Sequence, residues 1–343
     1  MNDNKLNKIA ITLSEPPRGI LAADESTNTI TKRFDGIDVD SSFENRRKYR
    51  ELLFKTPDLN KFISGVILFD ETIRQSTSEG IPFAEFLKNL GISVGIKVDT
   101  GALQLSPGSP EKITEGLDGL DKRLEEYKKL GAIFTKWRAI IDINEENSIP
   151  SDYAIDLNCF NLARYARIVQ NHGLVPIVEP EVIMDGNHNI HSCYDITSKT
   201  QKSLFQHLKT HSVDLSGILL KPNMVISGKN CSEQASVDEV ASLTVKCLKE
   251  NVPSQVPGIV FLSGGQSNEL ATQHLDQMNK SSEIFSWNLS FSYGRALQQP
   301  ALNAWQGEEK NIRKSQEALY KRSNLNSSAT LGKYSIDLEN LQT

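Results

Sequence analysis

The chain has 343 residues, a formal net charge of −5 at pH 7 and 38% hydrophobic residues. This composition is typical of a globular protein with a large core, and its mild acidity argues against a general nucleic-acid binder. No apolar run approaches the roughly 20 residues of a membrane span, and the polar residues 1–5 lead into no apolar signal segment. The four cysteines form no Cys-x-x-Cys pair, so we expect reduced thiols and a cytoplasmic location.

Eight short apolar runs recur along the chain, separated by longer stretches that mix apolar and charged residues. Most runs are rich in Ile, Val and Phe and too short for a helix, so they are predicted to be β-strands. They are apolar at nearly every position, which is typical of parallel strands covered on both faces. In chain order they are residues 19–23, 62–69, 94–98, 132–137, 175–178, 218–220, 259–262 and 287–291.

Helical patterns fill several of the intervening stretches. The clearest are residues 41–54, 117–130, 156–172 and 236–250. Gly131 and Gly173 follow two of them, and glycine commonly ends a helix. Strands alternating with helices in a chain of this length favour an α/β fold, specifically a (β/α)8 TIM barrel, over a doubly wound sheet. We expect a single barrel domain over residues 1–322.

Residues 323–343 differ from the rest of the chain because they are polar and weakly periodic. Terminal segments of this kind are commonly poorly ordered. We therefore expect a flexible C-terminal tail, which is either disordered or forms a lid over the mouth of the barrel.

A lysine closes one of the predicted strands. Lys221 follows Ile218–Leu220, and Pro222 and Asn223 end the strand directly after it. An amine held partly out of water loses affinity for its proton, and a neutral amine is a nucleophile toward carbonyl carbon. The alternative is a lysine that has just left the core and extends its amine to solvent. These residues alone leave both readings open.

Polar side chains with catalytic potential follow seven of the eight predicted strands. In a (β/α)8 barrel the chemistry lies at the carboxyl ends of the strands, so these groups are expected to meet in one mouth. A single charge at a strand end is usually only solvated, but seven such ends are harder to explain in that way. The groups are Asp24 to Ser26, Lys97 and Asp99, Lys136 and Arg138, Glu179 and Glu181, Lys221, Ser263 to Gly265, and Ser292 to Arg295.

The residues after the last two strands suggest an anion site. Ser263-Gly264-Gly265 and Gly294-Arg295 could bind phosphate through backbone N–H groups and a guanidinium, although each is also an ordinary glycine turn. Further cations around the mouth suit a substrate with a phosphate at each end. Asp24 and Glu179 are candidates for proton transfer. The additional cations are Lys97, Lys136 and Arg138.

A metal site is the weaker interpretation of another cluster. His188, His191 and Cys193 lie close together in sequence, and three such groups could ligate a metal. However, a lysine nucleophile and a metal are alternative ways to stabilise a carbanion, so Lys221 argues against one. We expect neither a metal nor another cofactor.

Nine segments together resemble class I fructose-bisphosphate aldolase. They occur in order over roughly residues 18 to 300, and unrelated barrels do not share so many such segments in register. The segments are GILAADEST, ENRRKYR, GIKVDTG, GLDGL, KWR, VPIVEPE, LLKPNM, FLSGGQS and FSYGRALQ. The resemblance implies reversible cleavage of fructose 1,6-bisphosphate to dihydroxyacetone phosphate and glyceraldehyde 3-phosphate through a lysine Schiff base, in glycolysis and gluconeogenesis.

The resemblance also implies roles for individual residues. Lys221 corresponds to the Schiff-base lysine and Glu179 to the proton carrier of carbinolamine formation and dehydration. Asp24 corresponds to the residue that assists cleavage of the C3–C4 bond, with Lys136 beside it, and Glu181 to a further charged position of the site. The implied substrate-binding positions are Ser26 and Lys97 near the 6-phosphate, Ser263, Gly264, Gly294 and Arg295 at the 1-phosphate, and Arg46 and Arg138 as charged positions.

Three departures from the family pattern concern the surroundings of the site. Ser216 stands where the family usually has Glu, and Thr100 where it often has Lys. Many members end in a tyrosine that tunes substrate preference, whereas this chain ends in Leu341-Gln342-Thr343. Preference between fructose 1,6-bisphosphate and fructose 1-phosphate is therefore left open.

Two other functions compete with this interpretation. One is a different Schiff-base barrel enzyme, such as transaldolase or deoxyribose-phosphate aldolase, although the doubled set of cations favours a bisphosphate. The other is a scaffold role, since the family binds cytoskeletal and other protein partners. The resemblance further implies a homotetramer, with no nucleic-acid or membrane partner.

Overall fold

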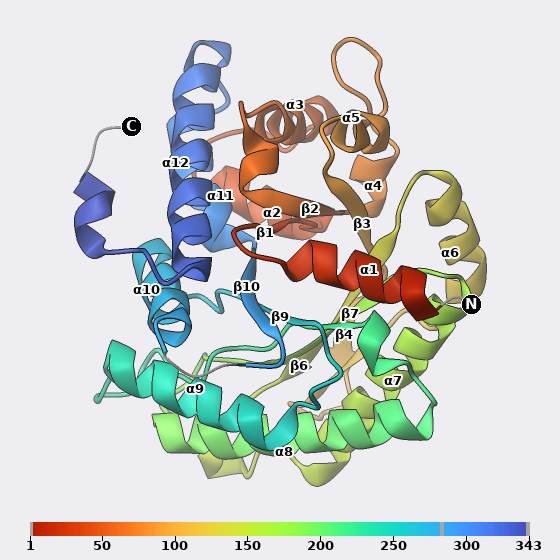
Figure 1. The fold of residues 1–343 in the computed structure, drawn as a ribbon, viewed down its shortest axis with the longest axis vertical. Helices are drawn as coiled ribbons and strands as arrows, with labels where there is room; N and C mark the ends of the chain where they lie inside the picture. Colours follow the sequence, from red (N-terminus) through yellow and green to blue (C-terminus); the bar gives the residue numbers. More distant parts are fainter. Residues whose placement is uncertain (1–2, 282–284, 341–343) are drawn as a thin grey trace.

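The computed structural model describes residues 3–281 and 285–340. Its centre is a closed barrel of eight strands in the order β1-β10-β9-β8-β7-β6-β3-β2, and every neighbouring pair is parallel. The predicted (β/α)8 fold is confirmed (Figure 1). The strands are β1 Gly19–Ala23, β2 Ile63–Leu68, β3 Ser93–Lys97, β6 Phe134–Ile141, β7 Val175–Val182, β8 Leu219–Leu220, β9 Gly258–Phe261 and β10 Asn288–Tyr293.

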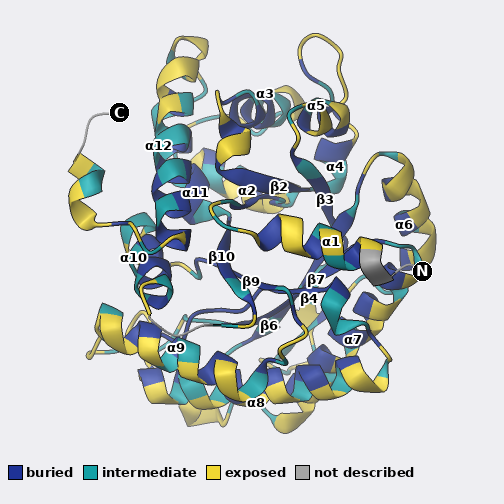
Figure 2. Ribbon diagram, viewed as in Figure 1, coloured by how far each residue is buried: buried dark blue, intermediate teal, exposed yellow. Residues whose placement is uncertain are grey.

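Helices surround the barrel and cover its outer face. Figure 2 shows the strands buried along their length, whereas outer helices such as α8 and α9 alternate buried and exposed residues. Among the described residues, no helix combines the length and apolar character of a membrane span. The helices are α1 Asp3–Ser14, α2 Thr27–Asp35, α3 Phe43–Phe54, α4 Asp70–Ile73, α5 Phe83–Asn89, α6 Leu120–Lys129, α7 Asp152–Asn171, α8 Ile190–Thr210, α9 Val237–Asn251, α10 Asn268–Asn279, α11 Arg295–Trp305 and α12 Ile312–Thr330.

Short polar side chains set where several helices begin. Ser42, Ser151 and Ser236 each accept a hydrogen bond from a backbone N–H in the first turn of α3, α7 and α9. Such caps satisfy a donor that would otherwise lack a partner. The cap at Ser151 explains why α7 begins before the residue 156 expected from periodicity.

Helix α1, which was not predicted, covers the amino-terminal end of the barrel. Leu6, Ala10 and Leu13 pack into a cluster with residues of the barrel strands, and the Ser64 hydroxyl donates to Leu13 O at 2.7 Å. In Figure 1 the helix lies across the strands. Because this end is closed, the opposite end is the one open to a ligand.

A small antiparallel hairpin was also not predicted. It consists of β4 Gly101–Gln104 and β5 Lys112–Glu115, which pair with each other and not with the barrel. The hairpin lies in the connection between β3 and α6, at the carboxyl end of β3.

The structure differs from the expected flexible tail beginning at Ser323. Residues 323–330 are the last turns of α12, which lies beside α10 and α11 (Figure 1). Ser323 and Asn326 are buried, and the Thr272 hydroxyl of α10 donates to Asn326 Oδ1 at 2.6 Å. Buried polar side chains give no apolar period, so this part of the helix was missed. The domain boundary expected after residue 322 therefore moves at least to Thr330.

The segment after α12 is also tied to α10. The Tyr334 backbone N–H donates to Asp276 Oδ1 at 2.8 Å, and Arg322 pairs with Glu339 at 2.7 Å. Residues 341–343, on which the comparison of the chain's end with the family pattern depends, lie outside the described residues.

Glu51 of α3 carries a pH-dependent part of the stability. Burial raises the pKa of Glu51, but hydrogen bonds from Lys55, the Ser78 N–H and Arg47 outweigh it and lower the pKa to about 2. Because this pKa lies below that of the unfolded chain, the stabilisation is complete above pH 4.5 and is lost as the pH falls toward 2. Glu51→Gln is expected to lower the free energy of unfolding at pH 7 by about 2 kcal/mol.

Urea denaturation at pH 7 and at pH 4 checks this expectation, since the difference from wild type should shrink at the lower pH. Glu44→Gln on the same helix is the matched control, because the Glu44 side chain is 53% exposed and Glu51 only 11%. The control should cost less. A deficit in Glu51→Gln that does not change with pH would refute the assignment.

Candidate active site

A cavity of about 240 Å³ opens at the carboxyl ends of the barrel strands. It contains every residue to which the family resemblance gives a role except Arg46. Six cationic side chains and four carboxylates line it, so the lining has an excess of positive charge. The lining residues are Ala22, Asp24, Glu25, Ser26, Thr29, Arg33, Lys97, Lys136, Arg138, Glu179, Glu181, Lys221, Leu262, Ser263, Gly264, Gly265, Ser292, Gly294 and Arg295.

Strand geometry brings the central charges together. Lys136 and Arg138 lie within β6, and Glu179 and Glu181 lie within β7. Residues two apart on a strand point to the same face, so both pairs face the cavity. The sequence placed these residues at strand ends. In fact both strands continue beyond them, to Ile141 and Val182.

Two lysines share one carboxylate at the centre of the cavity. Glu179 lies 3.1 Å from the Nζ of Lys221 and 3.1 Å from the Nζ of Lys136. Lys136 also contacts Asp24 at 2.7 Å. Lys221, Lys136 and Glu179 are each at most 4% exposed. The chain Asp24–Lys136–Glu179–Lys221 is thus a continuous line of paired charges in a largely dry setting.

These contacts set the protonation of Asp24, Glu179 and Lys136. Burial raises the pKa of Asp24, but Lys136 and Lys221 outweigh it and hold that pKa well below its usual range. The same two lysines lower the pKa of Glu179 against the effect of burial. Burial lowers the pKa of Lys136, but Asp24 and Glu179 overcome this and raise it above its usual value. Lys136 therefore stays protonated at neutral pH, which leaves Lys221 as the candidate nucleophile.

One side of the cavity is built to receive an anion. Ser263, Gly264 and Gly265 form a tight turn after β9, in which both glycines have positive φ, +48° and +73°. Gly294 precedes the first turn of α11, and Arg295 opens that helix. Backbone N–H groups and a helix amino terminus favour negative charge. Both segments line the same cavity, and the Arg295 guanidinium donates to the backbone carbonyl of Gln266, which follows the glycine turn.

Other polar groups line the remaining rim of the cavity. Lys97 pairs with Asp99, and Arg138 pairs with Glu181. The Ser26 and Thr29 hydroxyls lie 3.1 Å apart at the start of α2. These groups form a second polar region of the rim, and they come from parts of the sequence distant from the glycine turn.

Arg33 is a lining residue that the sequence analysis missed. Its guanidinium contacts the Glu25 carboxylate at 2.5 Å, and the Arg50 guanidinium contacts the other oxygen of the same carboxylate at 2.8 Å. The signal was available, since Ser26, Thr29 and Arg33 are spaced to share one face of α2. Burial lowers the pKa of Arg295, and the nearby charge of Arg33 lowers it further. Arg33 Nη2 lies 3.9 Å from the position that a Cβ would take on Gly294, and Arg33 and Arg295 line the same cavity.

Arg46 does not line the cavity. Its guanidinium binds both oxygens of Glu71, at 2.7 and 2.6 Å, and also donates to Ser41 O. This geometry gives no support to the expected role of Arg46 in substrate binding.

The alternative metal cluster does not assemble. Within the described residues, no group of three or more His, Cys, Asp or Glu side chains is placed to hold a metal ion. His188 is buried with neither ring nitrogen hydrogen-bonded to a described residue, and burial lowers its pKa. Cys193 lies instead against Thr197 and Asn223.

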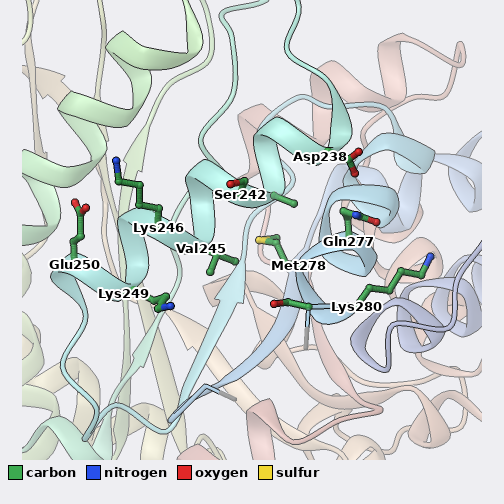
Figure 3. Close-up of a pocket in the computed structure, with 11 residues that line it drawn as sticks. Asp238, Ser242, Val245, Lys246, Lys249, Glu250, Gln277, Met278 and Lys280 are labelled. Carbon is green, nitrogen blue, oxygen red and sulfur yellow. The ribbon is translucent and has the colours of Figure 1, made fainter. Parts of the chain in front are cut away.

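A larger cavity, of about 640 Å³, lies between α9 and α10 (Figure 3). It shares no residue with the barrel mouth. Its Lys246 stacks on the Tyr194 ring, and its Lys280 pairs with Asp276 at 2.5 Å. Size alone would favour this cavity, but it lacks the buried lysine–carboxylate chain, so we place the active site in the barrel mouth.

Known proteins agree with this geometry. The chain matches the profile of the family described as fructose-bisphosphate aldolase class-I over residues 5–343. A probable fructose-bisphosphate aldolase class 1 of Xanthomonas campestris is 54% identical, over 97% of this chain and 99% of that one. Cytosolic fructose-bisphosphate aldolase 6 of Arabidopsis thaliana is 49% identical, over 96% of this chain and 91% of that protein.

A solved structure extends the agreement to three dimensions. It is the fructose-bisphosphate aldolase of Plasmodium falciparum in a complex with TRAP and a small-molecule inhibitor. It superposes with a TM-score of 0.95 at 47% identity, covering 97% of this chain and 96% of that one. The chain therefore belongs to the class I fructose-bisphosphate aldolases, metal-independent lyases that cleave fructose 1,6-bisphosphate through a Schiff base.

Proposed function

We propose that Lys221 forms the Schiff base and that Glu179 carries the protons of its formation. The observation that carries this assignment is the position of Glu179, 3.1 Å from the amines of both Lys221 and Lys136. Of the two amines, Lys136 is held protonated by its carboxylate partners. Lys221 is therefore the amine available to attack a carbonyl.

The first half of the reaction builds an electron sink. Lys221 Nζ attacks C2 of the open-chain ketose, and a C–N bond forms as the carbonyl electrons move to oxygen. Glu179 carries a proton from the attacking nitrogen to the C2 oxygen, which becomes a hydroxyl. Glu179 then delivers a second proton, taken up from solvent, and the hydroxyl leaves as water. The resulting iminium is a cation next to C3. Glu181 lies on the same strand as Glu179. It pairs with Arg138 and so contributes to the charge balance around the iminium.

The second half breaks the carbon–carbon bond. Asp24 accepts the proton of the C4 hydroxyl, the C3–C4 electrons move toward the iminium, and glyceraldehyde 3-phosphate leaves. Lys136, paired with Asp24 at 2.7 Å, keeps that carboxylate ionised as a base. The enamine is then protonated at C3, and water releases dihydroxyacetone phosphate from Lys221. Each step is reversible, which suits both glycolysis and gluconeogenesis.

The substrate phosphates occupy opposite sides of the mouth. The glycine turn with Ser263 and Gly264, together with Gly294 and Arg295, receives the 1-phosphate. Ser26 and Lys97 receive the 6-phosphate, and Arg138 adds charge between them. The excess of cations over carboxylates in the lining supports a doubly anionic ligand.

Steady-state cleavage of fructose 1,6-bisphosphate and fructose 1-phosphate, each with EDTA present, tests this arrangement. Lys97→Met should raise KM for the bisphosphate about tenfold and leave KM for fructose 1-phosphate nearly unchanged. Activity should survive chelation. An equal effect on both substrates would place Lys97 outside the 6-phosphate site, and loss of activity with EDTA would contradict the Schiff-base route.

The relatives also suggest a cellular location and an oligomeric state for this chain. We propose a cytoplasmic homotetramer, supported by the cytosolic names of two Arabidopsis thaliana relatives and by the exposed Tyr153 and Phe160 on α7. A solution mass of four 38.2 kDa chains by light scattering would agree, and a monomer would not.

An additional partner-binding role is the second candidate function. It is motivated by the Plasmodium falciparum relative, which was solved with TRAP. A Lys221→Ala variant that binds a cytoskeletal or other partner but no longer cleaves substrate would separate this role from catalysis.

A further inference from the structure

Gln266 follows the glycine turn but does not line the cavity. It is 4% exposed, and its backbone N–H donates to Ser263 O at 3.0 Å. This bond closes a four-residue turn whose two central residues, Gly264 and Gly265, both have positive φ. Glycine adopts that pair of conformations without steric cost, whereas other residues rarely do. The shape of the turn is thus fixed by Gln266 at its end.

The Gln266 side chain holds the same carbonyl a second time. Its Nε2 donates to Ser263 O at 3.0 Å and contacts the Met224 sulfur at 3.6 Å. The Gln266 backbone carbonyl accepts a hydrogen bond from Arg295 Nη2. One buried residue therefore contacts the turn after β9, the arginine at the start of α11, and the segment that follows Lys221.

These bonds decide which way a peptide dipole points. A trans peptide directs its C=O and its N–H in opposite directions. The Ser263 carbonyl is held toward the buried Gln266, so the N–H of Gly264 in the same peptide points away from it, toward the cavity. Within the described chain, the Gly264 N–H donates to no recorded partner. Because Gly264 lines the cavity, its N–H is available to an anion that binds there.

His274 of α10 fixes the orientation of the Gln266 amide. Its Nδ1 lies 2.6 Å from Gln266 Oε1. A carbonyl oxygen only accepts, so the amide nitrogen must face Ser263 O and the amide oxygen must face His274, whose Nδ1 then carries the proton. His274 is 2% exposed, and burial lowers its pKa to about 4, so the ring is neutral near pH 7. The histidine is a fixed donor and not a titrating group at that pH.

We propose that Gln266, oriented by His274, is a positioning residue for the phosphate monoester that binds the glycine turn. It keeps the Gly264 N–H and the Arg295 guanidinium in place for the 1-phosphate without touching the substrate. The inference rests on the proposed function of the barrel mouth, since it concerns how one of its anion-binding elements is held.

Two variants at His274 form a matched pair. His274→Asn places an amide donor near the position of Nδ1, and His274→Leu fills similar space with no donor. His274→Leu should raise KM for the bisphosphate about tenfold with kcat within about twofold. His274→Asn should stay close to wild type. Gln266→Met, which keeps length but loses both side-chain hydrogen bonds, should resemble His274→Leu and serves if that variant fails to fold.

Product inhibition separates positioning from general damage. Dihydroxyacetone phosphate carries the 1-phosphate, so its inhibition constant should rise about tenfold in His274→Leu and Gln266→Met. The inhibition constant of glyceraldehyde 3-phosphate should not change. Equal weakening of both products, or no change in either, would overturn the proposal. Borohydride trapping on Lys221 in the wild type is run alongside, because its failure would refute the proposed function and not the role of Gln266.

Discussion

Lys221→Met is expected to lower kcat for fructose 1,6-bisphosphate cleavage by about 10⁵-fold, a loss comparable to removal of a covalent nucleophile in other enzymes. Methionine cannot form an imine, so the electrons of the C3–C4 bond have no sink. The substitution replaces the amine of a residue that is 4% exposed with an unbranched apolar side chain of similar volume. The fold should therefore persist.

The matched control is Lys136→Met, which removes the other buried amine that contacts Glu179. It should also reduce kcat, because Asp24 and Glu179 lose the charge that keeps them ionised. However, it should still form a trapped adduct, since Lys221 remains. Circular dichroism and melting temperature verify folding in both variants. Retention of more than about 1% of wild-type kcat in Lys221→Met would contradict its role as the nucleophile.

Glu179→Gln is expected to lower kcat by about 10³-fold, within the range attributed to general acid–base catalysis. The amide has nearly the same shape but cannot carry a proton between the C2 oxygen and the lysine nitrogen. It also removes a carboxylate that contacts both lysines. KM should change little by comparison, because the phosphate-binding groups are untouched.

Glu181→Gln is the control for Glu179→Gln. Glu181 lies two residues along the same strand and pairs with Arg138 instead of the lysines. It should lower kcat much less. Rapid quench with borohydride should show that the adduct accumulates more slowly in Glu179→Gln than in Glu181→Gln. Equal rates of adduct formation in the two variants would assign the proton transfer to another group.

The strands and most of the site could be predicted from the sequence. Runs such as 94–98 and 259–262 are apolar because barrel strands are covered on both faces, and this property is local. Lys221, Glu179 and Asp24 could be chosen as candidates because each is a charged residue directly after or within an apolar run, where a charge is costly to bury. Their convergence followed from the general rule that barrel strands end at one mouth.

Other features depend on contacts distant in sequence. The side chains of Arg50 and Glu25 are 3% and 4% exposed and form a buried ion pair. Glu25 in turn pairs with Arg33. Nothing in the local pattern around Arg50 distinguishes it from a surface residue of α3. The role of Gln266 likewise depends on His274 and Arg295, which come from different helices.

Two helices were missed, wholly or in part, for physical reasons that can be identified. The last turns of helix α12 were assigned to a flexible tail because the buried Ser323 and Asn326 are polar, so no apolar period marked them. Helix α1 was missed although Leu6, Ala10 and Leu13 repeat at helical spacing, because the short segment carries little charge pattern beside them. In both cases burial was decided by the neighbouring elements.

The most direct test of the account is covalent trapping. The enzyme is mixed with fructose 1,6-bisphosphate and EDTA, reduced with borohydride, digested and analysed by tandem mass spectrometry. We expect one reduced dihydroxyacetone phosphate adduct per chain on Lys221, none on Lys136, and no adduct in Lys221→Met. An adduct on Lys136, or full activity with no adduct on any lysine, would contradict the assignment of Lys221 as the Schiff-base residue.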